Sequence, residues 1–154
     1  NSVIRLLEEE RLLTLADSSY VLIEFMPSVP YSEICTAVRN LSRTGYIPVI
    51  AHAERYRCLR KGKRLEELIG LDALIHTNYK SVGGSWRDVT AHWCRDNLKK
   101  GNVHLMGTDM HNTGNRMPDT KEAMSWMRTH LDRTYLKKIT KDNALRITEN
   151  KIIK

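Results

Sequence analysis

The sequence has few cysteines and no long hydrophobic run, and both shortages exclude classes of protein. Its three cysteines, Cys35, Cys58 and Cys94, are widely spaced and form no CxxC pair. A disulfide framework is therefore not expected, and a reducing cytoplasm fits best. No apolar run is long enough to cross a bilayer, so membrane insertion is not predicted. Three acidic residues within positions 1–10 exclude a signal peptide there. The chain does not begin with Met, so we expect a fragment or a processed product.

Negative charge is also scarce. The chain has 25 Lys and Arg against 18 Asp and Glu, which gives a net charge of +7. Such a balance suits nucleic acid, an anionic surface or a phosphorylated substrate. The basic residues are scattered, however, and the densest stretch, Arg55–Arg64, contains no aromatic residue other than Tyr56. Because this is a weak signal for nucleic acid, we predict no nucleic-acid partner.

What the sequence does contain is an alternation of short apolar runs with amphipathic segments. Four runs are apolar at consecutive positions, which is typical of buried strands: Tyr20–Phe25, Ile47–Ala51, Ala73–Thr77 and Val103–Gly107. Helical spacing or terminal signals mark seven further segments: Val3–Leu15, Tyr31–Thr44, Lys63–Ile69, Ser85–Lys100, Pro118–Arg128, Arg133–Lys138 and Lys141–Ile147. The alternation predicts an α/β fold with a parallel sheet. Since no linker interrupts it, we expect a single domain over residues 1–154.

The helix expected at residues 85–100 carries detailed signals at both ends. Ser85 is expected to be its N-cap, with Asp88 completing a capping box. Gly101 is expected to end it. Three residues are expected to share one of its faces: Trp86, Val89 and Trp93.

Polar side chains follow the first two expected strands. Glu24 is a carboxylate within the first apolar run, where burial is costly unless a cation is near. The second strand is followed by His52, Glu54 and Arg55. Histidine is the commonest metal ligand, and arginine suits bidentate phosphate binding. The alternative is that Glu24 faces water, that His52 is structural, and that Glu54 and Arg55 are surface charges.

The fourth strand ends in a second candidate group. Asp109 and His111 are two residues apart, so they project in the same general direction from an extended strand end. Together they offer one oxygen and one nitrogen to a divalent metal. Arg116 follows within the turn at residues 112–118. A turn rich in Asn, Gly and Asp is the alternative. Because several strands end in such groups, the pattern favours a metal-assisted phosphoesterase.

The third strand is less informative. It ends in His76-Thr77-Asn78, followed by Ser81. This segment either offers polar contacts to a substrate or is a turn leading to the next helix. The remaining histidines are expected to be structural or surface residues: His92, His104 and His130.

Three of these segments resemble the later motifs of the PHP (polymerase and histidinol phosphatase) family: Tyr20–Phe25, Pro48–Tyr56 and Gly107–His111. They are most similar to its bacterial branch of manganese-dependent protein-tyrosine phosphatases of capsular and exopolysaccharide synthesis. This resemblance covers nearly the whole chain. It implies the C-terminal part of a distorted (β/α)7, TIM-like barrel with two or three metal ions at its rim.

The resemblance also implies roles for individual residues. Glu24, His52, Asp109 and His111 look like metal ligands, and Arg55 and Arg116 look like the cations that hold the phosphate. The implied metal is manganese, with iron or zinc as alternatives, and the implied nucleophile is metal-activated water. The implied substrate is phosphotyrosine on a tyrosine kinase of polysaccharide synthesis.

Two departures from the family pattern qualify what this chain is expected to do. Ala53 replaces a proline that is usual in the family. No His-x-His motif precedes the segments above, because His52 is the first histidine. We therefore expect weak activity or none from this chain alone, and self-association of an open half-barrel. Two alternatives are a non-catalytic PHP module that binds a phosphorylated or acidic partner, and an amidohydrolase-like enzyme on a related barrel.

Overall fold

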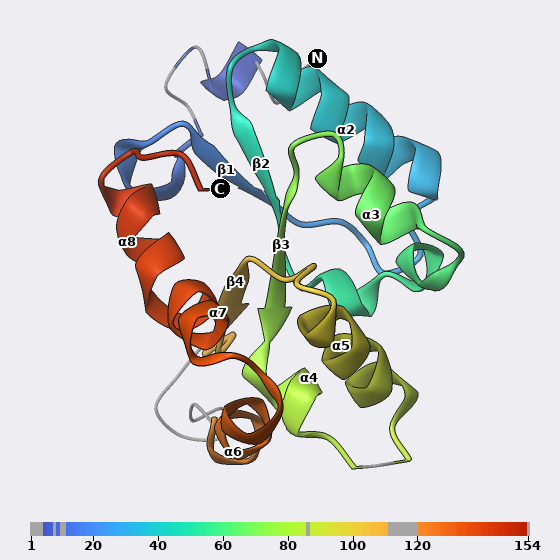
Figure 1. Cartoon of the computed structure of the whole chain (residues 1–154). Coiled ribbons are helices and arrows are strands. Elements are labelled where there is room, and N and C mark those ends of the chain that lie inside the picture. The colour runs from blue at the N-terminus through green and yellow to red at the C-terminus, as the bar shows by residue number, and fades with distance from the viewer. Residues whose placement is uncertain (1–4, 8, 10–11, 86, 111–119, 154) are drawn as a thin grey trace.

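The computed structural model describes residues 5–7, 9, 12–85, 87–110 and 120–153. Within them, four parallel strands form one sheet in the order β1-β2-β3-β4 (Figure 1). Their bounds are Tyr20–Ile23, Ile47–Ile50, Leu74–Asn78 and Leu105–Gly107. All four expected strands are present, and most are a residue or two shorter than expected. The prediction of an α/β fold with parallel strands is confirmed.

Helices lie between and after the strands. They are η1 (Leu15–Asp17), α2 (Tyr31–Arg43), η2 (Ala53–Arg55), η3 (Arg57–Arg60), α3 (Arg64–Ile69), α4 (Tyr79–Gly83), α5 (Val89–Lys99), α6 (Lys121–His130), α7 (Arg133–Lys137), η4 (Lys138–Asp142) and α8 (Asn143–Thr148). In Figure 1 the sheet runs between α2 and α3 on one side and α8 on the other. Within the described residues, no helix combines the length and apolar character that a bilayer crossing requires.

Both faces of the central strands are buried, which explains their consecutive apolar residues. Ile50 and Ile75 pack in the cluster formed with α2 and α3. Their neighbours Val49 and Leu74 point the other way and pack with Ile147 of α8. Because successive residues of a strand face opposite sides, a strand covered on both sides must be apolar throughout.

The start of α5 differs from the prediction. Asp88 is the N-cap, and its carboxylate accepts hydrogen bonds from the backbone N–H groups of Thr90 (2.7 Å) and Ala91 (3.4 Å). The helix therefore begins at Val89 rather than at Ser85. Val89 is 68% exposed, whereas Trp93, expected on the same face, is half-buried and packs against two hydrophobic clusters. The buried residues of α5 are Ala91, Cys94, Asn97 and Leu98, and Trp86 lies outside the described residues.

Two other segments also differ from expectation. Residues 79–83, which were expected to be a loop or turn, form α4. The expected N-terminal helix at residues 3–15 is not continuous, because residues 12–14 are not helical and η1 follows them. In this segment Leu7 is buried, with 5% of it exposed, whereas Leu13 is 86% exposed.

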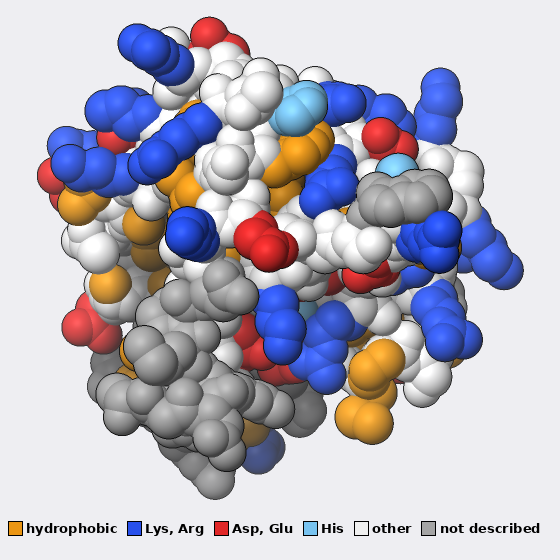
Figure 2. All heavy atoms as spheres, turned by 90° about the horizontal axis from the view of Figure 1, so that it is seen from below, with side chains coloured by type: hydrophobic (Ala, Val, Ile, Leu, Met, Phe, Trp, Pro, Cys, Tyr) orange, Lys and Arg blue, Asp and Glu red, His pale blue; other side chains and the backbone are white. Residues whose placement is uncertain are grey.

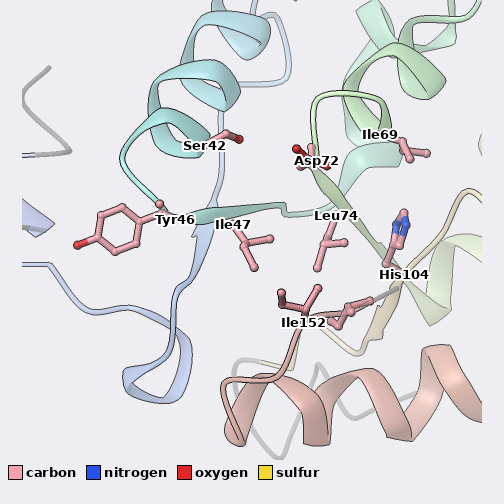
Figure 3. A pocket seen from close by; sticks show the side chains of 11 residues that line it. Ser42, Tyr46, Ile47, Ile69, Asp72, Leu74, His104 and Ile152 are labelled. Atoms are coloured by element: carbon pink, nitrogen blue, oxygen red, sulfur yellow. The ribbon is translucent and has the colours of Figure 1, made fainter.

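The amino-terminal edge of the sheet contains a cavity of about 410 Å³. Ile47 at the start of β2 and Leu74 at the start of β3 line it, and Ile152 faces them from the C-terminal segment (Figure 3). Tyr46, Asp72 and His104 also line it. The cavity is therefore at the opposite edge of the sheet from the strand ends that carry the candidate ligands.

His104 beside this cavity is a structural histidine, as expected. Its Nδ1 accepts a hydrogen bond from the Ile75 N–H (3.1 Å), and its carbonyl oxygen accepts one from Asn143 Nδ2 (2.8 Å). Burial and, to a smaller extent, the nearby Lys138 ammonium together lower the pKa of His104 to about 4. The imidazole is thus neutral in the folded protein at physiological pH.

The low pKa of His104 predicts a loss of stability in acid. The unfolded chain takes up this proton near pH 6.5, whereas the folded protein does so only near pH 4. The burial of His104 therefore does not weaken the free energy of unfolding above pH 6.5. That free energy falls by about 3 kcal/mol as the pH drops from 6.5 to 4. We expect His104→Asn, which keeps an acceptor near the Nδ1 position, to reduce that acid loss. Urea unfolding of both proteins from pH 7.5 to 4 measures it, and identical pH dependence would contradict the expectation.

Candidate functional site

The fold brings the polar residues at the strand ends to one edge of the sheet. Glu24 directly follows β1, while His52 and Asp109 each lie two residues beyond the ends of β2 and β4. In parallel α/β sheets, functional sites form at this carboxyl edge. Figure 2 views the molecule from below, the side towards which β3 points in Figure 1, and shows acidic and basic side chains next to one another.

His52 and Asp109 face each other. His52 Nε2 lies 3.7 Å from Asp109 Oδ1, and the two side chains are 12% and 34% exposed. Both backbones are left-handed, with φ of 50° at His52 and 51° at Asp109. Such conformations are costly for residues with a side chain and concentrate at functional sites. The sharp turns after β2 and β4 therefore point an imidazole nitrogen and a carboxylate oxygen at the same space.

Glu24 and Arg55 form a second pair. Arg55 Nη1 donates a hydrogen bond to Glu24 Oε1 at 2.8 Å, and the two side chains are about half exposed. An ion pair this accessible to water contributes at most about 1 kcal/mol. Of the sequence-predicted residues, the structure thus joins Glu24 to Arg55 and His52 to Asp109. His111 and Arg116 lie outside the described residues.

Glu54 is buried rather than a surface charge, so the alternative was wrong for this residue, whereas Arg55 and Glu24 are exposed. Its Oε1 accepts hydrogen bonds from the Asn78 N–H (3.2 Å) and the Ser81 hydroxyl (2.9 Å), while Oε2 has no hydrogen-bond partner. Burial raises the pKa of the Glu54 carboxyl above its ordinary value. Arg60 Nη2 donates to the Glu54 carbonyl oxygen at 2.8 Å. The hydrogen bonds of Glu54 therefore link the turn after β2 to the residues at the start of α4.

The end of β3 supports His52, and sequence reasoning did not identify this role. His76 Nδ1 accepts a hydrogen bond from the His52 N–H (3.2 Å), and the two rings pack edge to face with centroids 5.2 Å apart. Asn78 Oδ1 lies 3.2 Å from His52 Nδ1. Burial, and then the neighbouring His52, lower the pKa of His76 to about 4. The signal in the sequence was two polar residues at alternate positions of a strand, which share one face.

The absence of a side chain at Gly107 makes room for His76. A Cβ atom at this position would lie 2.2 Å from His76 Nε2. We expect Gly107→Ala to displace that ring and to lower the free energy of unfolding by about 1–3 kcal/mol through overpacking. Gly70→Ala is the matched control, because its Cβ would meet backbone atoms only at 3.4 Å or more. Urea unfolding compares them, and equal stabilities would contradict the expectation.

The donor atoms on this edge suit a divalent metal, but the described set is small. Nitrogen and carboxylate oxygen are ligands that manganese, iron and zinc all accept. An ion at ordinary bond lengths of about 2.0–2.2 Å can contact both His52 Nε2 and Asp109 Oδ1 across their separation. Among residues 5–7, 9, 12–85, 87–110 and 120–153, no group of three or more His, Cys, Asp or Glu is arranged to hold a metal. The pair thus fits as part of a ligand set.

Known proteins resemble this chain over nearly its full length. The family model for capsular polysaccharide synthesis, CpsB/CapC, matches residues 1–149. Tyrosine-protein phosphatase CpsB of Streptococcus pneumoniae is 32% identical over 153 residues, which cover 96% of this chain and 63% of the relative. Tyrosine-protein phosphatase YwqE of Bacillus subtilis is 33% identical over 121 residues, covering 77% of this chain and 47% of the relative.

A solved structure agrees with the sequence relatives. It is described as YwqE from Bacillus subtilis and CpsB from Streptococcus pneumoniae, unique metal-dependent tyrosine phosphatases. The match has a TM-score of 0.85 and 28% identity, and covers all of this chain and 62% of the other. The chain therefore spans less than two thirds of the length of these relatives. The predicted resemblance is confirmed, and the chain belongs to the CpsB/CapC family of capsular polysaccharide synthesis.

Proposed function

We propose that this chain is part of a metal-dependent protein-tyrosine phosphatase of capsular or exopolysaccharide synthesis. The observation that carries the proposal is the facing pair of His52 Nε2 and Asp109 Oδ1, 3.7 Å apart at the carboxyl edge of the sheet. Relatives named tyrosine-protein phosphatases and a solved structure described as metal-dependent support it. The same support favours an enzyme over a non-catalytic binding module.

Each residue of the site has a proposed role. His52 and Asp109 hold a divalent metal, and Glu24 and His111 complete the ligands that this chain contributes. The metal, once bound, lowers the pKa of a water molecule and neutralises charge on the phosphoryl group. Manganese is the proposed ion, with iron or zinc as alternatives and two or three ions in the complete site. Among the described residues no group of three or more His, Cys, Asp or Glu is arranged to hold a metal, so we propose that ligands beyond the described part of the chain complete the site together with Glu24.

Arg55 is proposed to hold the phosphate together with Arg116. A guanidinium binds phosphate through two parallel hydrogen bonds, and phosphoryl transfer depends mainly on such positioning and charge neutralisation. The pairing of Arg55 with Glu24 does not oppose this role strongly, because the pair is about half exposed and such pairs contribute at most about 1 kcal/mol. Arg55 can therefore exchange the carboxylate for a phosphate at small cost.

The remaining expectations concern the context of the enzyme. We propose that residues 1–154 belong to one domain, the later part of a (β/α)7 barrel, and that the protein acts in the cytoplasm. The proposed substrate is phosphotyrosine on a tyrosine kinase of polysaccharide synthesis. A net charge of +7 suits such an anionic substrate.

Metal removal tests the proposed function. We expect the complete gene product, treated with EDTA and desalted, to hydrolyse a phosphotyrosine peptide no faster than a protein-free control. Addition of Mn²⁺ is expected to restore hydrolysis more fully than Fe²⁺ or Zn²⁺. Residues 1–154 alone are expected to be a poor catalyst, because an incomplete ligand set loses affinity and geometry. Hydrolysis that persists in EDTA would exclude a metal-dependent phosphatase.

A further inference from the structure

Asn78 is the last residue of β3 and lies beneath the candidate metal ligand His52. Only 8% of Asn78 is exposed, and its Oδ1 lies 3.2 Å from His52 Nδ1. β3 is hydrogen-bonded to both β2 and β4, the two strands that precede His52 and Asp109. The residue therefore occupies the central position between the elements that supply the two facing donor atoms.

The contact with Asn78 determines which nitrogen of His52 is free. An amide oxygen only accepts hydrogen bonds, so this contact is a hydrogen bond when His52 Nδ1 carries the proton. The neutral ring then has its lone pair on Nε2, the atom that faces Asp109 Oδ1 at 3.7 Å. A histidine can bind a metal only through an unprotonated nitrogen, and the hydrogen bond at the other nitrogen selects the tautomer.

We propose that Asn78 is a positioning residue that fixes the Nδ1–H tautomer of His52 and thereby leaves Nε2 free for a divalent cation. The cation part of this inference rests on the proposed function. The tautomer part rests only on the contact between the two side chains.

Asn78 is itself held in place by a buried carboxylate. Its backbone N–H donates to Glu54 Oε1 at 3.2 Å, and Ser81 donates to the same oxygen at 2.9 Å. Glu54 is only 2% exposed and is two residues beyond His52 in the sequence. The turn that contains His52 and the strand end that contains Asn78 are thus tied together, which keeps the distance between the two side chains short.

His76 has a separate role that helps to isolate that of Asn78. Its Nδ1 accepts a hydrogen bond from the backbone N–H of His52 (3.2 Å), whereas Asn78 Oδ1 lies 3.2 Å from the ring nitrogen Nδ1 of His52. His76 and Asn78 are at alternate positions of β3 and so share one face. His76 therefore hydrogen-bonds the backbone of His52 and packs against its ring, whereas Asn78 is the hydrogen-bond partner of the ring nitrogen.

The tautomer is the direct test. We would record long-range ¹H–¹⁵N spectra of the complete gene product in EDTA, at a pH where imidazole is neutral, and assign His52 by its loss in His52→Gln. The wild-type ring is expected to show Nδ1–H with Nε2 unprotonated. Asn78→Leu is expected to shift the ring towards the Nε2–H form that imidazole prefers in water. Asn78→Asp, which keeps an acceptor of the same shape, is expected to retain the wild-type form.

The control is Asn97→Leu, which removes another buried amide. Asn97 is 5% exposed and donates to the Trp93 carbonyl oxygen within α5, so its loss is expected to leave the His52 tautomer unchanged. The inference is overturned if Asn78→Leu leaves the Nδ1–H form intact. It is overturned equally if Asn78→Asp or Asn97→Leu loses that form, because packing rather than the acceptor would then be responsible.

A second measurement uses Mn²⁺ alone, without substrate. Calorimetric titration is expected to show affinity about 10- to 100-fold weaker in Asn78→Leu than in wild type, as for other partners of metal-binding histidines. Asn78→Asp and Asn97→Leu are expected to stay close to wild type. Equal affinity in wild type and Asn78→Leu overturns the cation part. Wild-type protein that binds no Mn²⁺ counts against the proposed function, whereas the spectra still decide whether Asn78 sets the tautomer.

Discussion

His52→Asn is expected to reduce manganese-dependent hydrolysis of a phosphotyrosine peptide by at least about 100-fold, since even partners of metal ligands contribute 10- to 100-fold. Asparagine is the replacement of choice because the backbone at His52 is left-handed, with φ of 50°, and Asn tolerates that conformation better than Ala. The change thus removes the imidazole nitrogen that faces Asp109 while keeping the turn after β2. Steady-state kinetics at increasing Mn²⁺ concentration measures the effect.

An independent variant and a control strengthen this experiment. Asp109→Asn keeps the shape of the side chain and the left-handed backbone on the other side of the pair, and removes only the charge. It is therefore also expected to reduce Mn²⁺-dependent hydrolysis of the peptide. His92→Ala replaces an exposed histidine of α5 and is expected to keep wild-type activity. Activity of His52→Asn within tenfold of wild type would show that this ring does not bind the catalytic metal.

Arg55→Ala is expected to lower kcat/KM for the same peptide by about 10²–10³-fold, the usual effect of removing one donor to a transition-state oxyanion. Arg55→Lys is expected to recover only part of that loss, because an ammonium cannot make two parallel bonds to phosphate. The free energy of unfolding should change by less than about 1 kcal/mol, since the ion pair of Arg55 with Glu24 is about half exposed.

Arg57→Ala provides the matched control for Arg55. It removes an exposed arginine two residues away and the same amount of positive charge. It is therefore expected to leave kcat/KM nearly unchanged if Arg55 binds the phosphate directly. Equal losses in the two variants would mean that the general positive charge of the chain, rather than a specific contact, promotes the reaction. Steady-state kinetics and urea unfolding on the same preparations separate activity from stability.

Local signals were sufficient for most of the fold. Pro30 precedes α2 and Gly45 follows it, and the helix was predicted to within a residue of its observed bounds, Tyr31–Arg43. The apolar runs that became β2 and β3 were recognisable because both of their faces are covered. The N-cap of α5 was misplaced for a reason that is also local. Both Ser85 and Asp88 are good capping residues, and only the folded backbone shows that Asp88 accepts the free N–H groups.

The support for His52 was not predictable in the same way. Glu54 had the pattern of a surface charge, yet it is buried because Asn78 and Ser81, which are 24 and 27 residues away in the chain, donate hydrogen bonds to it. His76 and Asn78 had the pattern of a strand end leading into a loop. Their contacts with His52 depend on the pairing of β2 with β3, which no local pattern specifies.

The sequence by itself determined the class of fold, the order of its strands and helices, and the polar residues that follow the strands. These depend on hydrophobic spacing, helix-end residues and short motifs, all of which are local. Only the tertiary structure decided which of those residues meet: His52 with Asp109, Glu24 with Arg55, and Asn78 beneath His52. The physical reason is that parallel pairing aligns strand ends that are far apart in the chain, and the left-handed turns at His52 and Asp109 then aim their side chains at each other.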